Sequence, residues 1–415
     1  MSEICTHQGL LARNKLMDRR GSILISGAGI AGPALAYWLL RAGFVPALIE
    51  RARHFREGGY MIDFWGEGFD VADKMNLLPQ LREVGYNFNR IKFLDERGRT
   101  RSELGGRAFR SALGERFVSL QRGDLARAIF DTIEDKIEII YDDTITAIRE
   151  ERSGLDVSFE HSSSRQFDLV VGCDGLHSAV RRVAFGSEQQ FEKFLGYYAA
   201  SFLTTDYPHR EELTYVSYGA PGRQISRYAL RDNRSAFLFV FSRDRPFPNH
   251  PHERAAKQIV REVFSSDRWI EIPEILESMN ACDEFYFDSV SQIWMPAWSH
   301  GRTVLVGDAA YCPSLLAGEG AALAMAGAYV LAGELHRANG DYEQAFKVYE
   351  KQLRAFIESK QHSAERFAAS FAPATRFGLS VRDLVLRAAG LYLPLGKWLI
   401  RKMVGDQFAL PDYSL

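Results

Sequence analysis

The stretch SILISGAGIAGPALAYWLLRAGFVPALIER (22–51) constrains the fold more than any other part of the sequence. An apolar, β-branched run, SILIS, leads into the glycine-rich segment GAGIAG (27–32), and PALAYWLLRAG (33–43) has the composition of a helix that ends at a glycine. The apolar run PALIER (46–51) then predicts a second strand. Because a helix connects the two strands, they are expected to run parallel, as in a Rossmann-like doubly wound α/β domain.

The glycines of GAGIAG predict a nucleotide loop. Gly27 permits a tight turn, Gly29 lets the backbone approach a pyrophosphate, and Gly32 allows the helix to pack closely on the strand. The N-terminus of the helix offers free N–H groups to an anion. Glu50 ends the second strand, where its carboxylate can accept both hydroxyls of an adenosine ribose and disfavours a 2′-phosphate. The segment therefore predicts FAD or NAD as the resident nucleotide.

Two kinds of strand pattern follow along the chain. IEIIYDD (137–143), FDLVVGCDG (167–175) and RTVLVGD (302–308) are short apolar runs that end in Asp or Gly, as strands of a buried parallel sheet do. Between them, apolar and polar residues alternate in four segments, which predict a mostly antiparallel sheet inserted into the first domain. These segments are TYVSYG (214–219), SRYALRD (226–232), SAFLFVFSRD (235–244) and FYFDSVSQIWM (285–295).

The stretch GDAAYCPSLLAGEG (307–320) decides between FAD and NAD. Asp308 ends a buried strand, where a carboxylate can bind a polyol, and Pro313 precedes a new alanine-rich helix. Gly318 and Gly320 let N–H groups approach a ring carbonyl at the positive end of that helix. A ribityl chain and a reduced flavin ring match these features, so FAD is expected. A plain strand–turn–helix with an incidental Asp is the alternative.

The sequence resembles the group A, para-hydroxybenzoate hydroxylase-like FAD-dependent monooxygenases. Three stretches carry the resemblance in order: GAGIAGPALAYWLLRAGFVPALIER, CDGLHSAVR (173–181) and GDAAYCPSLLAGEGAALAMAGA (307–328). EGGYMIDF (57–64) and LQRGDLARAIF (120–130) are similar to the branch that contains the tetracycline-inactivating monooxygenases. The architecture implied is a doubly wound FAD-binding domain with an inserted, mostly antiparallel substrate-binding sheet and C-terminal helices.

The domain bounds expected from these patterns are an N-terminal extension over 1–20, an FAD-binding domain over 21–189 and 286–340, a substrate-binding domain over 190–285 and a C-terminal helical region over 341–415. That last region begins with Tyr342, Phe346, Tyr349, Leu353 and Phe356 at spacings of four and three, which predict a long amphipathic helix.

The resemblance also implies roles for single residues. Asp174 and Gly175 are implied to bridge FAD and a nicotinamide cofactor, and Arg56 matches a basic position associated with NADPH. Arg122 of QRGDL is implied to contact the phosphate and ribityl region of FAD. Alternatively, Arg122 could be a surface cation at a helix start, and Asp174 could only cap the next helix. The full expected cofactor set is Gly27, Gly29, Ile30, Ala31, Gly32, Glu50, Arg51, Gly59, Asp63, Arg122, Asp174, Gly175, Gly307, Asp308, Pro313, Gly318 and Gly320.

The chain departs from the family's usual pattern in the second glycine loop. Glu319 stands where Gln or Lys is usual, and Ala321 and Ala322 stand where an Asn commonly follows. A carboxylate that pointed at an anionic flavin would be unfavourable, so Glu319 is expected to face solvent or a cation.

The reaction implied by the resemblance is a hydroxylation carried out by the flavin. NADPH or NADH would reduce FAD, O2 would add at flavin C4a, and the hydroperoxide would give its distal oxygen to an electron-rich aromatic, phenolic or polyketide-like molecule. Tyr228, Phe237 and Phe239 alternate on the predicted sheet and are expected to contact that substrate, although such aromatics also build ordinary cores. No catalytic side chain or metal site is expected, and His177 and His300 are expected to be structural.

Two other functions fit the same motifs. A flavin-dependent oxidoreductase acting on a prenyl lipid or quinone suits the apolar C-terminus, and a non-catalytic flavin-binding sensor needs only the nucleotide loops. A halogenase is disfavoured, because QIWMPAW (292–298) only superficially matches the tryptophan signature of that class.

Composition narrows the partners and the cell compartment that are expected for this protein. A net charge of -2 over 415 residues disfavours nucleic acid as a partner. Four dispersed cysteines predict neither a disulfide framework nor a zinc site, and they fit the reducing cytoplasm.

The apolar segment 384–404 near the C-terminus is interrupted by Arg387, Pro394, Lys397, Arg401 and Lys402. It therefore predicts a covering helix pair or a peripheral membrane contact, not a spanning helix. The oligomeric state is not set by these features.

Overall fold

The computed structural model describes residues 21–56, 58–106, 114, 116–248, 250–404 and 408–415. The expected extension over 1–20, including Cys5, lies outside the described residues. The other three cysteines, Cys173, Cys282 and Cys312, are free thiols.

The first layer is a six-stranded sheet in which all strands but one edge strand are parallel. Its order is β17-β18-β11-β1-β2-β7, and the register places Ile25 of β1 beside Val171 of β11 and Leu48 of β2. The doubly wound α/β fold is thereby confirmed. The strands are β1 (Ser22–Ser26), β2 (Val45–Glu50), β7 (Glu138–Tyr141), β11 (Leu169–Gly172), β17 (Ser299–His300) and β18 (Thr303–Leu305).

Two helices pack against each other beside this sheet. Helix α2 (Ala31–Arg41) follows the glycine loop, and α11 (Gly320–Arg337) follows the second glycine loop. Trp38 of α2 meets the ring of Tyr329 in α11 with centroids 4.8 Å apart. Both helices are rich in alanine and glycine, which lets them approach closely and bury the core beneath them.

The second layer is a seven-stranded, mostly antiparallel sheet in the order β16-β12-β15-β14-β13-β4-β5. All four alternating segments form strands of this sheet, as predicted. Its strands are β4 (Arg90–Leu94), β5 (Thr100–Gly105), β12 (Glu192–Thr205), β13 (Thr214–Ala220), β14 (Arg223–Ala229), β15 (Arg234–Ser242) and β16 (Phe285–Ile293).

The observed sheet differs from the expected domain bounds at both ends. Strands β4 and β5 lie within the range expected for the FAD-binding domain, yet β4 pairs in parallel with β13. Strand β16, also assigned to that domain from Tyr286 onward, pairs with β12 over its length. Long-range pairing decides membership of a sheet, and local sequence does not report it.

Further strands form two smaller sheets. β3 (Met61–Trp65) pairs with β6 (Phe117–Gln121) in a two-stranded ribbon, and β8 (Ile145–Glu151), β9 (Gly154–Phe159) and β10 (Arg165–Phe167) form a three-stranded sheet. The remaining helices of this part are α3 (Gly66–Lys74), α4 (Leu78–Val84), α6 (Arg122–Phe130), α7 (Ala179–Ala184), α8 (Glu253–Phe264), α9 (Ile272–Ala281) and α10 (Asp308–Tyr311), with short 3-10 turns at Glu188–Gln190 and Leu315–Ala317.

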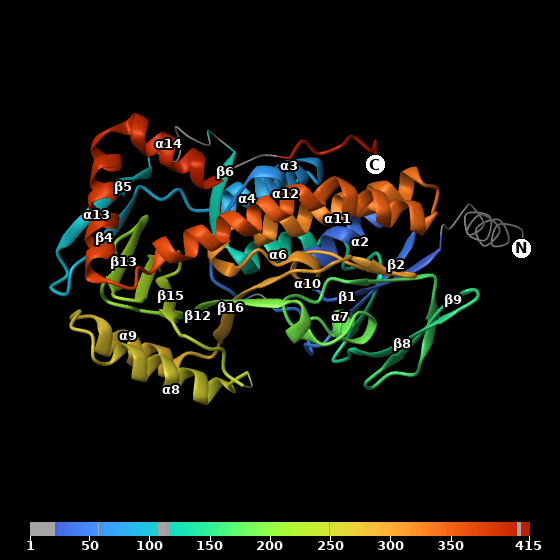
Figure 1. The fold of residues 1–415 in the computed structure, drawn as a ribbon, viewed down its shortest axis with the longest axis horizontal. Helices are drawn as coiled ribbons and strands as arrows, with labels where there is room; N and C mark the ends of the chain where they lie inside the picture. Colours follow the sequence, from blue (N-terminus) through green and yellow to red (C-terminus); the bar gives the residue numbers. More distant parts are fainter. Residues whose placement is uncertain (1–20, 57, 107–113, 115, 249, 405–407) are drawn as a thin grey trace, which may run out of the picture.

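The C-terminal region is helical, as predicted. Helix α12 (Tyr342–Phe371) runs along the molecule, and Asp341 caps it by accepting the Gln344 N–H at 3.2 Å. Helices α13 (Arg376–Leu391) and α14 (Leu393–Val404) form a pair at the end of the molecule beside β4 and β5 (Figure 1). Within the described residues, none of the helices is long and apolar enough to cross a membrane.

Candidate functional site

A cavity of about 510 Å³ opens at the carboxyl ends of β1, β2 and β11, the edge at which doubly wound sheets bind ligands. It brings together residues that are far apart in the sequence. Of the predicted residues, it is lined by Gly27, Gly29, Ile30, Ala31, Glu50, Arg51, Arg56, Arg122, Asp174, Gly175, Asp308, Gly318 and Gly320. The remaining predicted cofactor residues, Gly32, Gly59, Asp63, Gly307 and Pro313, are not part of its lining.

The glycine loop is built so tightly that Gly27 and Gly32 cannot carry side chains. Gly27 has φ +104°, and a Cβ there would lie 2.6 Å from the carbonyl oxygen of Cys173. A Cβ on Gly32 would lie 2.0 Å from the Gly27 carbonyl oxygen. Gly32 therefore acts behind the cavity wall, by letting α2 approach β1, which is the role the spacing predicts.

Glu50 lines the cavity and also holds the glycine loop in place by hydrogen bonds. Its Oε2 accepts the Ala28 N–H at 2.8 Å and its Oε1 accepts the Ala52 N–H at 2.9 Å. The Arg56 guanidinium lies 3.6 Å from the same carboxylate and is mostly exposed. Arg56 thus lies at the adenosine end of the cavity, and a contact with a nicotinamide cofactor stays a prediction.

Arg122 opens α6 and is half-buried at the cavity, so the reading as a plain surface cation does not hold. A Cβ on Gly59 would lie 3.1 Å from the Arg122 Cβ, and one on Gly29 would lie 3.3 Å from its Nη2. These two glycines leave room for the side chain. Among the described residues, its guanidinium has no hydrogen bond or ion pair, which leaves its donors available to a phosphate.

Asp174 combines the two roles weighed from the sequence. Its Oδ2 accepts the N–H groups of Ala179 and Val180, at 2.8 and 3.1 Å, so it caps α7. The same residue lines the cavity, and desolvation raises the pKa of its carboxyl. Gly175 follows with φ +80°, a left-handed conformation that glycine adopts without strain.

Asp308 lies across the cavity from the first loop, as the first residue of α10. Burial raises its pKa, and the positive charge of Arg122 opposes that rise. Gly307 before it has φ +68°, and a Cβ there would lie 3.3 Å from the Cβ atoms of Ala31 and Ala324. A desolvated carboxylate at this place is suited to accept hydrogen bonds from a polyol.

The loop after Asp308 is held at several points. Gly318 is left-handed, with φ +69°, and Ser314 is a non-glycine residue with φ +107°, a conformation that must be stabilised by its surroundings. The Ser314 hydroxyl accepts the Leu316 N–H at 3.2 Å. Pro313 anchors the loop by accepting the Gln292 side-chain amide at 3.0 Å. Pro313 therefore supports the cavity without lining it.

Glu319 faces a cation, one of the two outcomes expected for it. Its carboxylate is buried and lies 2.8 Å from the ammonium of Lys360 on α12. Trp65 also donates its indole N–H to this carboxylate at 3.3 Å. Burial raises the pKa of Glu319, while Lys360 opposes the rise.

Arg181, in the CDGLHSAVR stretch, is a supporting residue that the sequence reasoning missed. Its guanidinium is fully buried and donates to the Ala309 carbonyl at 3.0 Å and to the Leu176 carbonyl. Glu188 neutralises it at 2.9 Å. Arg181 therefore joins the loop that carries Asp174 to the helix that begins at Asp308, a link visible only in the folded chain.

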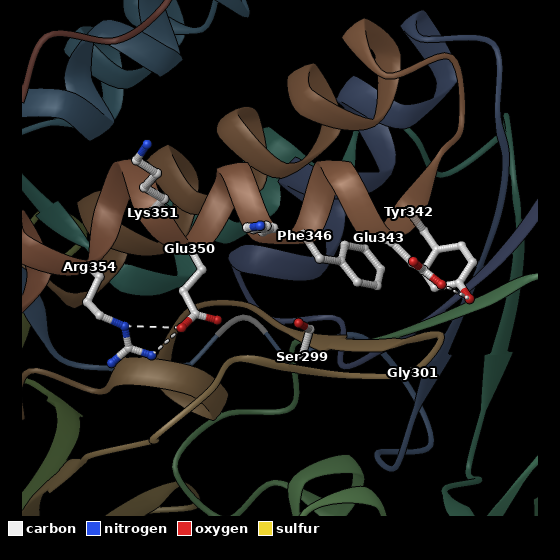
Figure 2. A pocket seen from close by; sticks show the side chains of 9 residues that line it. Ser299, Gly301, Tyr342, Glu343, Phe346, Glu350, Lys351 and Arg354 are labelled. Carbon is white, nitrogen blue, oxygen red and sulfur yellow. Dashed lines mark hydrogen bonds and ion pairs between the residues drawn. The ribbon is translucent and has the colours of Figure 1, made fainter.

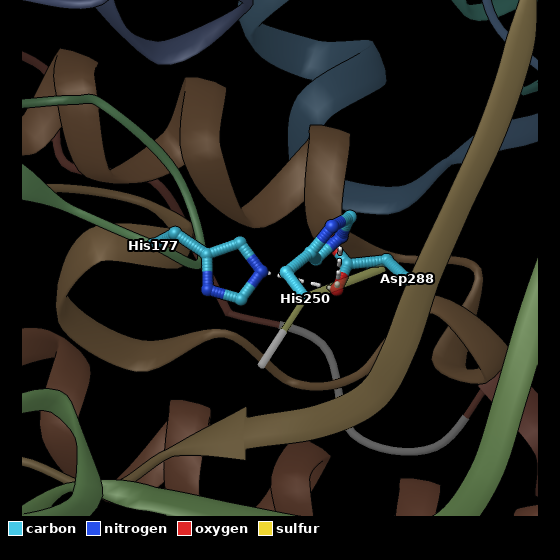
Figure 3. A group of neighbouring side chains, drawn as sticks. All are labelled: His177, His250 and Asp288. Carbon is cyan, nitrogen blue, oxygen red and sulfur yellow. Dashed lines mark hydrogen bonds and ion pairs between the residues drawn. The ribbon is translucent and has the colours of Figure 1, made fainter. Parts of the chain in front are cut away.

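His177 holds the two domains together at the cavity rim. Its Nδ1 lies 2.9 Å from Glu188. Its Nε2 lies 3.0 Å from Asp288 on β16, as Figure 3 shows. These two bonds raise its pKa to about 10, so the ring is an imidazolium at neutral pH. His250 also approaches Asp288, at 3.9 Å. Each ring nitrogen of His177 therefore has a carboxylate partner, and the three groups form an ion-pair cluster. This agrees with the expected structural role of His177.

The strand register separates the expected substrate residues onto two faces. Tyr228 is opposite Tyr215 and Ala236, and this face continues through Ser201 to Tyr286, which lines the cavity. Side chains directly opposite each other in antiparallel strands share a face. Tyr228 is therefore on the face that looks toward the cofactor cavity.

Phe237 and Phe239 are on the other face, so their expected substrate contact is wrong. Phe237 stacks on Phe202 with ring centroids 4.9 Å apart, and Phe239 packs against Phe264 of α8 at 5.2 Å. Both are fully buried beneath α8 and α9. Alternation fixes which residues share a face, but it does not say which face meets the cofactor.

Asp63 faces the substrate sheet instead of the cofactor cavity. It shares a face of β3 with Met61, which packs beside Tyr228, and it accepts a hydrogen bond from Ser119. Its side chain is solvent-accessible, yet the surrounding protein raises its pKa by desolvation. Burial is the main cause that raises the pKa of Tyr228, and the negative charge of Asp63 adds to the rise. Asp63 is thus on the side of the substrate sheet and is not part of the lining of the cofactor cavity.

Other cavity residues were not anticipated. Tyr60 and Tyr286 meet with ring centroids 5.5 Å apart, and both line the cavity with Asp288, Ser289 and Ser291 of β16. Desolvation is the main cause that raises the pKa of Tyr60 to about 12. The alternation of FYFDSVSQIWM predicts the strand, but only the pairing of β16 with β12 places it over the cavity.

A second hollow, of about 530 Å³, lies between α12 and the turn that joins β17 to β18 (Figure 2). It is lined by Ser299, Tyr342, Phe346 and Glu350, whose carboxylate binds Arg354 at 2.6 Å. None of the predicted site residues lines it. It therefore plays no part in the candidate site.

The comparison with known families agrees with the cavity. The sequence model of the family described as "FAD binding domain" matches residues 20–359. The chain belongs to this FAD-binding family. A flavin-dependent monooxygenase of Legionella longbeachae is 35% identical over 348 residues, covering 83% of this chain and 88% of that protein. An uncharacterised protein of Mycobacterium tuberculosis is 36% identical over 348 residues, covering 82% and 91%.

Solved structures extend the likeness to the whole fold. The tetracycline destructase Tet(51) superposes with a TM-score of 0.80 at 30% identity, covering 94% of this chain and 99% of that one. The Klebsiella pneumoniae protein HpxO, solved with FAD and uric acid, has the same fold with a TM-score of 0.74 at 19% identity, covering 91% and 96%. The chain is accordingly a flavin-dependent monooxygenase similar to the para-hydroxybenzoate hydroxylase-like enzymes, with FAD as its cofactor.

Proposed function

We propose that this monooxygenase uses NADPH or NADH and O2 to hydroxylate an electron-rich aromatic, phenolic or polyketide-like small molecule. The observation that carries the proposal is the polar group on the cofactor-facing side of the substrate sheet, formed by Asp63, Tyr215 and Tyr228. A site for a purely apolar lipid has no need of the buried Tyr228 hydroxyl beside a carboxyl group whose pKa is raised by desolvation, that of Asp63.

The cofactor cavity suits FAD on its own chemistry. Glycines leave space for a dinucleotide backbone, Arg122 offers free donors to a phosphate, and Asp308 offers acceptors to a ribityl chain. When bound, FAD supplies hydride acceptance and oxygen activation. Glu50 would hold the adenosine end, and Gly318 and Gly320 would face the ring end.

The residues beyond the cavity have roles toward a substrate. The Tyr228 hydroxyl is buried and has no hydrogen-bond partner among the described residues, so it can donate to a substrate carbonyl. The Asp63 carboxyl, with its raised pKa, can accept the proton of a phenol or enol and so enrich the ring in electrons. The two groups together favour a substrate that carries a carbonyl and an acidic hydroxyl.

The names of the relatives support the same substrate class. Tet(51) and Tet(55) are tetracycline destructases, at 30% and 31% identity to this chain. A tetracycline-like or other polyketide phenol is therefore the first substrate to test, and a simple aromatic acid is the second.

The test follows NADPH and NADH consumption by the FAD-loaded protein with a panel of phenols, polyketides, tetracyclines and quinones. We expect one panel member to accelerate oxidation of the reductant and to gain one oxygen atom from labelled O2, detected by mass spectrometry. Reduction of a quinone without oxygen transfer would support a prenyl-lipid or quinone oxidoreductase. Stable FAD with no ligand-stimulated oxidation would support a flavin-binding sensor.

A further inference from the structure

Exposed apolar side chains are concentrated on one part of the molecule. Among the described residues, the strongly exposed large hydrophobic side chains are Ile270 and eight residues of α13, α14 and their junction. Phe377 is 79% exposed and Leu391 is 90% exposed. We call these eight the C-terminal apolar face: Phe377, Val381, Leu384, Val385, Leu391, Tyr392, Leu393 and Trp398.

The spacing shows that the face is one continuous stripe on α13. Phe377, Val381 and Leu384 follow at intervals of four and three, and Leu391 comes seven residues after Leu384, so they share one side of the helix. The opposite side holds the buried Leu379 and Ala389. Helix α13 therefore has an apolar side toward the protein and a second apolar side toward the outside.

Basic residues accompany this face. The segment 376–404 contains six Lys or Arg residues, of which Arg382 points toward the protein, and a single acid, Asp383, in a chain whose net charge is -2. Asp383 is buried and interacts with Arg101 and Arg382, so it presents no negative charge to the outside. Arg376 and Arg401 are exposed at the two ends of the helix pair.

We propose that the C-terminal apolar face is an interfacial membrane-binding surface that docks on bilayers rich in anionic lipids. Apolar stripes with flanking Lys and Arg side chains bind in the headgroup region of membranes, with aromatic side chains such as Tyr392 and Trp398 at the boundary. The positive charge selects an anionic lipid surface over an apolar protein partner. The helices α13 and α14 lie together at one end of the molecule, where a flat surface can reach them (Figure 1).

The docked helix also lies over the substrate sheet. Arg382 of α13 donates to Gln224 of β14 at 3.0 Å and lies over the ring of Phe93 at 4.6 Å. Gln224 shares the face of β14 that carries Tyr228, because they are four residues apart in a strand. A membrane at this end would therefore lie on the substrate side of the protein, whatever the substrate is.

The experiment measures binding of the FAD-loaded full chain to vesicles by co-sedimentation, with phosphatidylcholine alone and with added phosphatidylglycerol. We expect binding to the anionic vesicles that weakens at high salt. Leu391→Ser and Phe377→Ser should each lower the partition coefficient by about tenfold, because each removes one large apolar side chain from the interface. Arg401→Glu should weaken binding to anionic vesicles only.

The matched control is Ile270→Ser, because Ile270 is 78% exposed but lies outside the C-terminal apolar face. It should leave vesicle binding unchanged. Equal effects of Ile270→Ser and Leu391→Ser, or no binding to anionic vesicles, would overturn the proposal. So would a dimer in light scattering that Leu391→Ser dissociates, because the face would then cover a second copy of the chain. Flavin absorbance verifies that each variant is folded.

Discussion

The carboxylate of Glu319 lies 2.8 Å from the ammonium of Lys360, and both side chains are buried. Glu319 immediately precedes α11 in the loop expected to hold the flavin ring, and Lys360 is on α12. The pair thus ties that loop to the C-terminal helix. It also explains how an acid is accommodated at a position where the resembling family usually has Gln or Lys.

Breaking this pair should be costly. Lys360→Met leaves a buried carboxylate without its cation, and we expect the free energy of unfolding to fall by about 3–5 kcal/mol. Denaturant titration of the FAD-loaded protein measures the change.

The double variant Glu319→Leu, Lys360→Met is the control, because it removes both charges. It should recover most of the lost stability. A double variant as unstable as Lys360→Met alone would show that the charge pairing is not what the loop requires.

Asp308→Ala should weaken FAD binding. Removing the carboxylate takes away charge-assisted hydrogen bonds to the ribityl chain, worth about tenfold to hundredfold in the dissociation constant. Flavin fluorescence during FAD titration of the apoprotein measures it. Asp135→Ala, at an exposed position outside the cavity, is the matched control and should bind FAD like the parent. Equal affinity of both variants would contradict the ribityl assignment.

Gly27→Ala should disturb the glycine loop far more than Gly43→Ala. Both glycines have positive φ, +104° and +86°, so both substitutions carry backbone strain of about 1 kcal/mol. Only at Gly27 would the new Cβ meet backbone, 2.6 Å from the Cys173 carbonyl oxygen, whereas Gly43 has open space. We expect Gly27→Ala alone to lose bound FAD, measured as the flavin-to-protein absorbance ratio.

Stability should depend on His177 over a defined pH range. Its bonds to Asp288 and Glu188 raise its folded-state pKa from 6.5 to about 10. The stabilisation is fully present below pH 6.5, where the unfolded chain is also protonated, and is lost as the pH rises toward 10. Because the ring is partly exposed and its charge is screened by solvent, the expected loss in the free energy of unfolding is about 1 kcal/mol.

The unfolding free energies of the parent and His177→Gln should therefore converge as the pH rises from 6.5 to 10. His54→Gln, at an exposed histidine that has no such partners among the described residues, is the control and should show a constant difference. A constant difference for His177→Gln as well would contradict the ion-pair cluster.

Tyr228→Phe should weaken substrate binding without loss of FAD, because the buried Tyr228 hydroxyl is not part of the lining of the cofactor cavity. We expect KM for the substrate found by the panel to rise about tenfold. Tyr218→Phe is the matched control, since Tyr218 is on β13 but packs on Trp269 beneath the helices. An equal effect of the two variants would count against the assigned face.

Local sequence was enough to predict the elements of the nucleotide site. Gly27, Glu50 and Asp308 could be located because each lies at the carboxyl end of a buried strand, and parallel strands bring these ends to one edge. The chemistry of FAD binding depends on backbone shape and a few charges, which short motifs encode directly. The family membership followed from the same stretches.

Other parts of the site depended on long-range pairing. The alternation around Phe237 and Phe239 predicts a strand, but the pairing of β12 with β16 decides that these rings face the helices. In the same way, nothing adjacent to Glu319 in sequence indicates Lys360, which is 41 residues away.

The sequence by itself thus determined the parallel sheet, the glycine loops and the cofactor, because these follow from residue order within single βα units. Only the tertiary structure decided which face of the inserted sheet meets the cavity, which cation neutralises Glu319 and which side of α13 stays exposed. Each of these is a contact between segments that are distant in the chain, and a local pattern carries no information about its partner.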